Sequence, residues 1–443
     1  MAEIIPFRAL HYNTQRGDHL SNLVTQPYDK ISPQMQSRYY SLSPYNLVRI
    51  IRANDQLEAT SSEDPYARAN RHFRGWIEQG ILISEREPAL FPYSQEYFVP
   101  GQPGAKKTRK GFIALLRLED YDRRVVHRHE ETLSGPKADR LSLLRATRAH
   151  FGQIFLLYSD PGGVIESSLD AAASGKPWEQ VEDEYGTQHS VWKVNGEEAI
   201  SHVIEEMRDK KLVIADGHHR YETALAFRNE CRAQNILSER AEYVMATLVR
   251  MEQPGLTILP THRVIHSLTN FSWEKLSSAA RDAFEWTEAS LPGNSGDAVS
   301  LIAPKIIPDG RPTFGVYAGQ GKFAVLRLRK DFDLAQALPD VPPQLLELDV
   351  VVLHRWLLEK TLGIDRQAVR EEKNLRYVRE IEAALDAVNR NKAQLCFLLN
   401  PTPIAAVWDA ALAELVMPQK STDFYPKLLS GLTVYWLDNP GGI

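Results

Sequence analysis

Short apolar runs alternate along this chain with polar, charged and proline-containing stretches. Apolar runs at residues 111–118, 155–158, 211–215 and 395–399 predict buried strands. Helical spacing of apolar side chains predicts helices over residues 65–79, 139–150 and 197–209. Strands interspersed with helices predict an α/β or α+β fold, with a mixed sheet flanked by helical lobes.

Charged and glycine-containing segments predict the connections between these elements. Residues 119–122 form a charged turn between the strand at 111–118 and a second strand at 125–130, which predicts a hairpin. A further hairpin is expected around Gly319 and Gly321. The polar segment 167–187 is expected to be an exposed connection.

The chain length of 443 residues exceeds what one hydrophobic core usually holds, so several subdomains are expected. We predict an N-terminal α/β region at 1–165 and a core at 166–270. An inserted α/β lobe is expected at 271–345, and a C-terminal helical region that completes the core at 346–443.

Charge and cysteine content narrow the class of protein. A formal net charge of -5 disfavours a general nucleic-acid binder. Cys231 and Cys396 fit no metal spacing and are predicted to be buried thiols in a reducing compartment. The first residues carry neither a basic lead nor a long apolar run, so we expect a cytoplasmic protein without a membrane anchor.

The strongest candidate for chemistry is the turn Asp216-Gly217-His218-His219-Arg220, which follows the strand 211–215 and precedes a helix expected at 221–234. Gly217 would let a ligand approach the backbone, and the helix would present free N–H groups to an anion. Arg220 offers a planar fork for phosphate oxygens, with His218 and His219 as further donors. Asp216 could hold a magnesium ion or accept a proton. The alternative is a tight turn whose arginine only pairs with a carboxylate.

A second charged stretch begins at residue 127. In a strand, His127 and His129 would share one face, with Arg128 and Glu130 on the other. Glu130 is a candidate general base, and Lys137 or Arg140 could neutralise phosphate. A solvated edge strand followed by a capped helix is the equally acceptable alternative.

The remaining candidate binding residues have less specific sequence patterns. Tyr28, Asp29 and Asn46 could line a substrate pocket, although such residues also make ordinary turns. The segment 420–422 together with Lys427 resembles an oxyanion-binding or phosphate-binding site. It lacks the glycines of a Walker loop, so a solvated loop is preferred there. The sequence contains none of the common dinucleotide, zinc-protease or serine-hydrolase motifs.

Several phrases together resemble the domain-of-unknown-function 1015 family. The matching phrases span nearly the whole chain: Ile5-Pro6-Phe7-Arg8-Ala9, Gln26-Pro27-Tyr28-Asp29, Ser43-Pro44-Tyr45-Asn46, His129-Glu130-Glu131-Thr132, Pro136-Lys137-Ala138-Asp139-Arg140, Ala215 to Ala224, Ile258 to Arg263, and Met417 to Thr422.

The Gly-His-His-Arg turn is also similar to the Gly-x-x-Arg phosphate loop of the ParB and sulfiredoxin-like superfamily, which includes free-serine kinases. The resemblance implies binding of ATP or ADP with Mg²⁺ and phosphoryl transfer to a small hydroxyl metabolite, with L-serine as the leading acceptor. It implies that Gly217 through Arg220 hold the phosphates. Asp216 would hold magnesium or orient the acceptor, and Glu130 would be the base.

Two alternatives stay open. A metal-dependent hydrolase would use His127, His129, His218 and His219 as zinc or manganese ligands. A nucleotide-switched, ParB-like binding protein would turn over no small molecule. The expected partner is a small-molecule substrate rather than a membrane or nucleic acid, and the oligomeric state is left open between monomer and homodimer.

Overall fold

The computed structural model describes residues 1–54, 63–102, 104–130, 134–236, 239–292, 295–307 and 309–442. Glu131 and Thr132 of the second charged stretch lie outside these ranges. Among the described helices, none combines the length and the apolar character that crossing a membrane requires.

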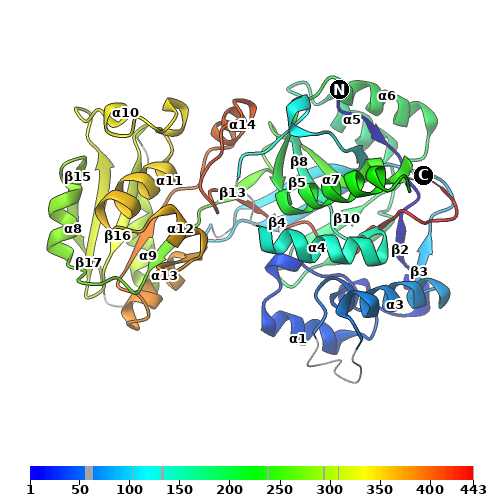
Figure 1. Cartoon of the computed structure of the whole chain (residues 1–443), viewed down its shortest axis with the longest axis horizontal. Coiled ribbons are helices and arrows are strands. Elements are labelled where there is room, and N and C mark those ends of the chain that lie inside the picture. The colour runs from blue at the N-terminus through cyan, green and yellow to red at the C-terminus, as the bar shows by residue number, and fades with distance from the viewer. Residues whose placement is uncertain are drawn as a thin grey trace. The chain divides into compact units, whose positions relative to one another are not determined.

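Contacts within the chain define two compact units (Figure 1). Unit 1 consists of Met1–Arg128, Thr132–Thr257 and Pro426–Ile443, and unit 2 consists of His129–Glu131 and Ile258–Tyr425. The chain therefore leaves unit 1 after Thr257 and returns to it at Pro426. The four segments predicted from the sequence have other limits and stay a prediction.

Unit 1 is built on a mixed sheet, as the alternation of elements predicted. Its described strands run in the order β6-β11-β8-β12-β5-β4-β10-β9, with β1 beside β5. Pairs β6–β11 and β8–β12 are parallel and the other pairs are antiparallel. The strands are β1 (Ile4–Ile5), β4 (Phe91–Phe98), β5 (Lys106–Arg117), β6 (Val126–His127), β8 (Ile154–Tyr158), β9 (Glu179–Glu182), β10 (Gln188–Val191), β11 (Leu212–Asp216) and β12 (Tyr243–Arg250).

Two small strand pairs accompany this sheet: β2 (Leu10–Tyr12) with β3 (Leu82–Ser84), and β7 (Ala149–His150) with β21 (Tyr435–Trp436). The helices of unit 1 are α1 (Pro33–Leu42), α2 (Val48–Ile51), α3 (Pro65–Glu78), α4 (Ser134–Thr147), α5 (Val164–Ala172), α6 (Glu197–Met207) and α7 (His218–Ala233). Short 3-10 turns are η1 (Thr14–Arg16), η2 (Leu20–Asn22), η3 (Tyr28–Lys30), η4 (Tyr121–Arg123) and η5 (Glu239–Glu242).

Helices pack in pairs against the sheet of unit 1. Helix α4 packs along α7, and α5 packs along α6 (Figure 1). Apolar side chains of α5, α6 and α7 join those of β5, β8, β11 and β12 in one buried cluster. The sheet is buried because its strands are almost continuously apolar, as the runs at 111–118, 155–158 and 211–215 predicted.

The hairpin expected at 111–130 is wrong. Strand β6 pairs in parallel with β11, while β5 pairs with β1, β4 and β12. Helix α7 decides the course of the intervening loop, because the Arg228 guanidinium donates to the Leu118 carbonyl at 2.6 Å and the Tyr221 hydroxyl donates to the Glu119 carbonyl at 2.7 Å. The exposed connection expected at 167–187 is also incorrect in part, since α5 and β9 lie in it.

Unit 2 contains an antiparallel sheet whose described strands run in the order β15-β17-β16-β19-β14-β18. These strands are β14 (His262–Ile265), β15 (Phe284–Ser290), β16 (Thr313–Tyr317), β17 (Lys322–Leu328), β18 (Leu375–Val378) and β19 (Leu395–Leu398). A separate pair is formed by β13 (Thr257–Leu259) and β20 (Asp423–Tyr425). The hairpin predicted around Gly319 is confirmed by the pairing of β16 with β17.

Helices α9 and α13 contribute to the core of unit 2 with the sheet. Its α-helices are α8 (Trp273–Ala280), α9 (Ser295–Ile302), α10 (Leu334–Ala337), α11 (Asp349–Val352), α12 (Arg366–Arg370), α13 (Ile381–Asn389) and α14 (Ile404–Leu412). The 3-10 turns η6 (Ala303–Lys305) and η7 (Pro343–Leu345) and the π-helix η8 (Leu353–Thr361) complete the list.

Both cysteines are free and buried, as predicted. Burial raises the pKa of the Cys231 thiol and that of the Cys396 thiol. The two side chains therefore stay protonated at neutral pH and act as small apolar groups.

Candidate functional site

The predicted turn lies where β11 ends and α7 begins. Asp216 is the last residue of β11, and α7 starts at His218 rather than at Tyr221. His218, His219 and Arg220 therefore form the first helical turn instead of a loop before it. Gly217 is required at the junction, because its φ of 97° is left-handed and a Cβ there would lie 3.1 Å from Nε of Arg220.

Cations surround the Asp216 carboxylate. The Lys427 ammonium lies 2.9 Å from its Oδ2, and Nη2 of Arg220 lies 3.4 Å from its Oδ1. Burial by itself would raise the pKa of Asp216, but the charges of Lys427, Arg220 and Lys30 outweigh it and hold this pKa well below the ordinary value. Asp216 is therefore an ionised carboxylate at neutral pH.

The Arg220 side chain is fixed from two sides. Its Nη1 donates to the carbonyl oxygen of Gln153, and the guanidinium packs over Gly217. A Cβ at Gly152 would lie 3.5 Å from Nη1, so the backbone at 152–153 approaches Arg220 closely. Only 14% of the Arg220 side chain is exposed, which leaves a pre-positioned cation at the start of α7.

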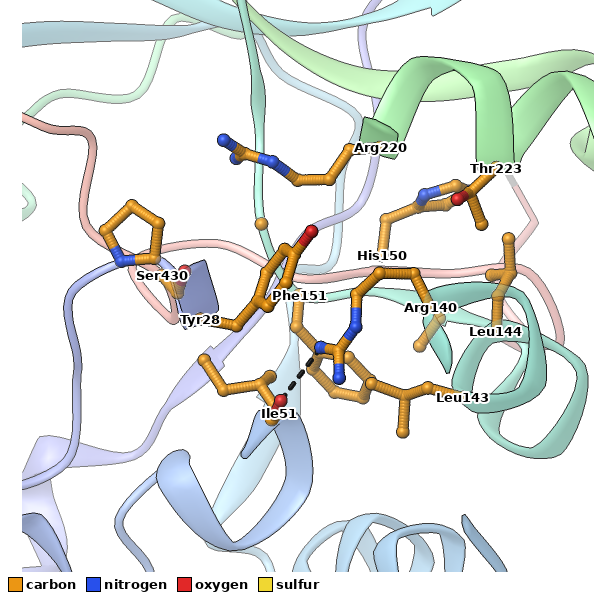
Figure 2. A pocket seen from close by; sticks show the side chains of 13 residues that line it. Tyr28, Ile51, Arg140, Leu143, Leu144, His150, Phe151, Arg220, Thr223 and Ser430 are labelled. Carbon is orange, nitrogen blue, oxygen red and sulfur yellow. Dashed lines mark hydrogen bonds between the residues drawn. The ribbon is translucent and has the colours of Figure 1, made fainter. Parts of the chain in front are cut away.

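Beside this cation cluster lies a cavity that is lined by both polar and apolar side chains (Figure 2). The Arg140 guanidinium lies 4.2 Å from the centre of the Tyr28 ring and donates to the Ile51 carbonyl at 2.8 Å. The lining residues are Pro27, Tyr28, Ile51, Arg140, Leu143, Leu144, Ala149, His150, Phe151, Gly152, Arg220, Thr223 and Ser430.

Two lining groups are neutral hydrogen-bonding groups at neutral pH. Burial raises the pKa of Tyr28, and Asp29 and Asp216 add to this effect while Arg220 and Arg140 oppose it. Burial lowers the pKa of His150 to about 4, and its ring stacks on that of Tyr435 at 5.7 Å. The cavity thus joins uncharged polar groups to fixed cations.

The structure brings together Asp216, Gly217, Arg220, Arg140 and Tyr28 of the predicted site residues. Asp29 lies beside Tyr28 in η3. These residues come from three distant parts of unit 1, so their proximity was not visible in the sequence.

Other predicted residues have different surroundings. The Lys137 ammonium lies 3.5 Å from the Glu222 carboxylate. Asn46 is fully buried, where its amide donates to the Asn22 carbonyl at 2.8 Å and accepts from the Val48 N–H at 2.9 Å. This geometry gives no support to a substrate contact by Asn46.

Three more predicted residues remain as predictions. His218 is buried and His219 is half-buried in the first turn of α7. Glu130 belongs to unit 2, where its Oε1 accepts from the Lys420 N–H at 2.6 Å. Its suggested role as a base is untested by this contact.

Sequence reasoning did not place Lys427 or Lys30 beside Asp216. It considered Lys427 for an anion site with residues 420–422 but preferred a solvated loop, whereas only 10% of its side chain is exposed. Its neighbours Pro426 and Leu428 carry no phosphate-loop pattern. No local sequence pattern identifies Lys427, because its contact with Asp216 forms only where the chain returns to unit 1.

A magnesium ion fits poorly at Asp216 in this arrangement. One carboxylate oxygen faces Lys427 and the other faces Arg220, so a cation would have to replace one of them. Within the described ranges, no three His, Cys, Asp or Glu side chains are grouped as a metal site would need. Within the same ranges, the four histidines of the alternative hydrolase form no such group, and His127 instead contacts the Arg124 carbonyl at 3.1 Å.

Comparison with protein-family models tests the family resemblance that the sequence motifs suggested. A family model described as "Protein of unknown function (DUF1015)" matches residues 4–351. The chain belongs to this DUF1015 family. The DUF1015 match contains Tyr28, Lys30, Asp216 and Arg220, while Lys427 lies beyond it. None of the curated proteins matches the chain.

A search of solved structures finds partial likenesses that include a free serine kinase. A mutant of that kinase in complex with AMP has a TM-score of 0.36 and 11% identity, covering 72% of this DUF1015 chain and 92% of the kinase. Another mutant in complex with ADP has a TM-score of 0.36 and 12% identity, covering 76% and 98%. SbnI from Staphylococcus aureus, truncated at its C-terminus, has a TM-score of 0.35 and 11% identity, covering 74% and 90%. At these TM-scores the likenesses decide nothing about chemistry.

Proposed function

We propose that this protein is a nucleotide-dependent phosphotransferase that acts on a small hydroxyl metabolite, with free L-serine as the leading acceptor and ATP or ADP as the donor. The observation that carries the proposal is the cation cluster at the start of α7. Lys427, Arg220 and Lys30 all stabilise the Asp216 carboxylate, and two of them contact it directly. Phosphate groups are the ligands that cations gathered at a helix N-terminus favour.

Each residue has a role in this proposal. Arg220 and Lys427 would neutralise the transferred phosphoryl group, and Gly217 would let its oxygens approach the backbone. Phosphoryl transfer depends mainly on such positioning and charge neutralisation. Mg²⁺ would arrive with the nucleotide, held by phosphate oxygens and water rather than by Asp216.

Asp216 would orient the acceptor hydroxyl. Because cations hold its pKa far below neutrality, the carboxylate stays ionised and can accept a hydrogen bond from the hydroxyl, but it is too weak a base to remove the proton. Tyr28 and His150 would contact the polar part of the acceptor or of the nucleotide, and the apolar wall around Phe151 would exclude water. The role of Glu130 as a base stays a separate prediction.

The test is nucleotide consumption by the purified protein with Mg²⁺, with and without L-serine. Arg220→Ala and Lys427→Met should each lower turnover at least tenfold and weaken nucleotide binding. The matched controls Arg145→Ala and Lys110→Met remove cations of surface ion pairs in unit 1 and should change neither. Equal activity of Arg220→Ala and Arg145→Ala, or the absence of nucleotide binding by the wild type, would rule the proposal out.

A further inference from the structure

A row of buried polar side chains crosses three neighbouring strands of unit 1. Arg109 on β5 lies directly opposite Gln95 on β4, and Gln95 lies directly opposite His189 on β10. We call these three residues the polar row. All of them are at most 2% exposed, in a sheet whose other buried residues are mostly apolar. Burying such polar groups lowers the stability of the fold unless each forms hydrogen bonds, so the partners of these three side chains matter.

One end of the polar row holds the chain segment that carries Lys427. Nη2 of Arg109 donates to the Pro426 carbonyl at 2.5 Å, and the Gln95 amide donates to the Lys427 carbonyl at 2.8 Å. Gln95 in turn accepts from Nε of Arg109 at 3.0 Å. Two consecutive carbonyls are thereby fixed immediately beside the residue whose ammonium contacts Asp216.

The other end of the polar row reaches the segment that carries Tyr28. Nε2 of His189 lies 3.2 Å from the Asp183 carboxylate, and the same carboxylate accepts from the Gln26 amide at 3.1 Å. Gln26 is two residues before Tyr28 in the chain. Since Asp183 accepts from Nε2, Nδ1 of His189 is left to accept from the Tyr93 hydroxyl at 2.6 Å.

Arg109 also contributes charge to the site. Burial lowers its pKa to about 10, which leaves the guanidinium protonated at neutral pH, and the Asp216 carboxylate stabilises its positive charge. The guanidinium lies 4.6 Å from the centre of the Phe155 ring on β8. It therefore adds a buried positive charge that interacts electrostatically with the Asp216 carboxylate.

We propose that Gln95 and Arg109 are positioning residues, which fix the backbone at 426–427 so that the Lys427 ammonium stays at Asp216. His189 and Asp183 extend the same hydrogen-bonded chain to the segment before Tyr28. The consequence for catalysis rests on the proposed function, whereas the placement of Lys427 does not. The polar row thus connects, through hydrogen bonds, the segment at 426–427 and the segment before Tyr28, which are far apart in sequence but both lie near the Asp216 carboxylate.

The experiment compares Gln95→Leu with Gln394→Leu in the full chain. Gln394 is a matched control, because its amide also holds one backbone residue, Leu268, through two hydrogen bonds at 2.9 and 2.7 Å, but it lies in unit 2. The rate of Lys427 acetylation by acetic anhydride is measured by mass spectrometry. Gln95→Leu should raise this rate at least fivefold, and Gln394→Leu should leave it unchanged.

Gln95→Glu separates positioning from loss of packing. A glutamate keeps the oxygen that accepts from Arg109 but cannot donate to the Lys427 carbonyl when ionised. We expect Gln95→Glu to fold and still to raise the Lys427 acetylation rate. An unchanged rate in this variant, or an equal rise in Gln394→Leu, would overturn the inference.

Nucleotide binding distinguishes the inference from the proposed function. If the wild type binds ADP, Gln95→Leu should weaken binding about tenfold, close to the effect of Lys427→Met. If the wild type binds no ADP, the phosphotransferase proposal fails, and the acetylation rates still decide whether Gln95 positions Lys427. Arg109→Lys should restore part of the protection that Arg109→Met loses, and equal rates in both variants would contradict the role of Arg109.

Discussion

At the scale of single residues, the Asp216 carboxylate is the group on which several cations act. Removing its charge leaves Lys427 and Arg220 without their anionic neighbour. Because the Asp216 side chain is 22% exposed and that of Lys427 is 10% exposed, the pair is only partly screened by solvent.

Asp216→Asn should therefore lower the free energy of unfolding by about 2 kcal/mol at pH 7. The folded-state pKa of Asp216 is depressed, so its contribution is present above the ordinary value of 3.8 and is lost as pH falls below it. Urea denaturation should show the difference between the variant and the wild type shrinking by about 1 kcal/mol at pH 3. A difference that is constant with pH would show that the cations do not act on this carboxylate.

Gly217 is a second residue whose replacement has a defined outcome. Gly217→Ala places a Cβ at a left-handed φ and 3.1 Å from Arg220, whereas Gly175→Ala has a similar φ of 94° with no atom within 4 Å. Both should lose about 1 kcal/mol of unfolding free energy from backbone strain. Only Gly217→Ala should also displace Arg220 and weaken ADP binding, as isothermal titration would show. Equal binding by the two variants would contradict the assignment of Arg220.

At the scale of elements, the sequence predicted individual strands and helices better than their pairing. The apolar runs at 155–158 and 395–399 became β8 and β19, because burial on both faces leaves a local signal. The partner of β6 depended instead on Tyr221 and Arg228 of α7, which lie about a hundred residues away. The same limit applied to the contact of Lys427 with Asp216, because these two residues are 211 positions apart in the sequence.

Tyr221 anchors α7 to the loop after β5. Its hydroxyl both donates to the Glu119 carbonyl and accepts from the Glu119 N–H at 3.1 Å, and the side chain is fully buried. Tyr221→Phe should cost about 1–3 kcal/mol of unfolding free energy, since two backbone groups lose their partner. Tyr185→Phe, at a side chain that is 57% exposed, should cost almost nothing. Urea denaturation checks both values, and equal stability of the two variants would refute the anchoring role.

At the scale of the whole molecule, net charge and local charge have opposite signs. The chain carries a formal net charge of -5, whereas the candidate site gathers Lys30, Arg220 and Lys427 around one carboxylate. If the net charge governed anion binding, added salt would screen the repulsion and strengthen it. If the cation cluster governs it, salt weakens binding.

We expect ADP affinity to fall about tenfold between roughly 0.05 and 0.5 M salt. Isothermal titration at several potassium chloride concentrations measures this, and Lys427→Met should show a shallower dependence than the wild type. Affinity that rises with salt would exclude the cluster as the binding site.

The return of the chain at Pro426 has a consequence for biosynthesis. A ribosome must make all of residues 258–425 before it adds Lys427, although most of unit 1 has been translated by then. Until that moment the nascent unit 1 lacks both the strand β21 and the ammonium that faces Asp216. Under the proposed function, phosphate binding has to await the translation of Lys427, and a chain released before that residue would lack part of the cation cluster.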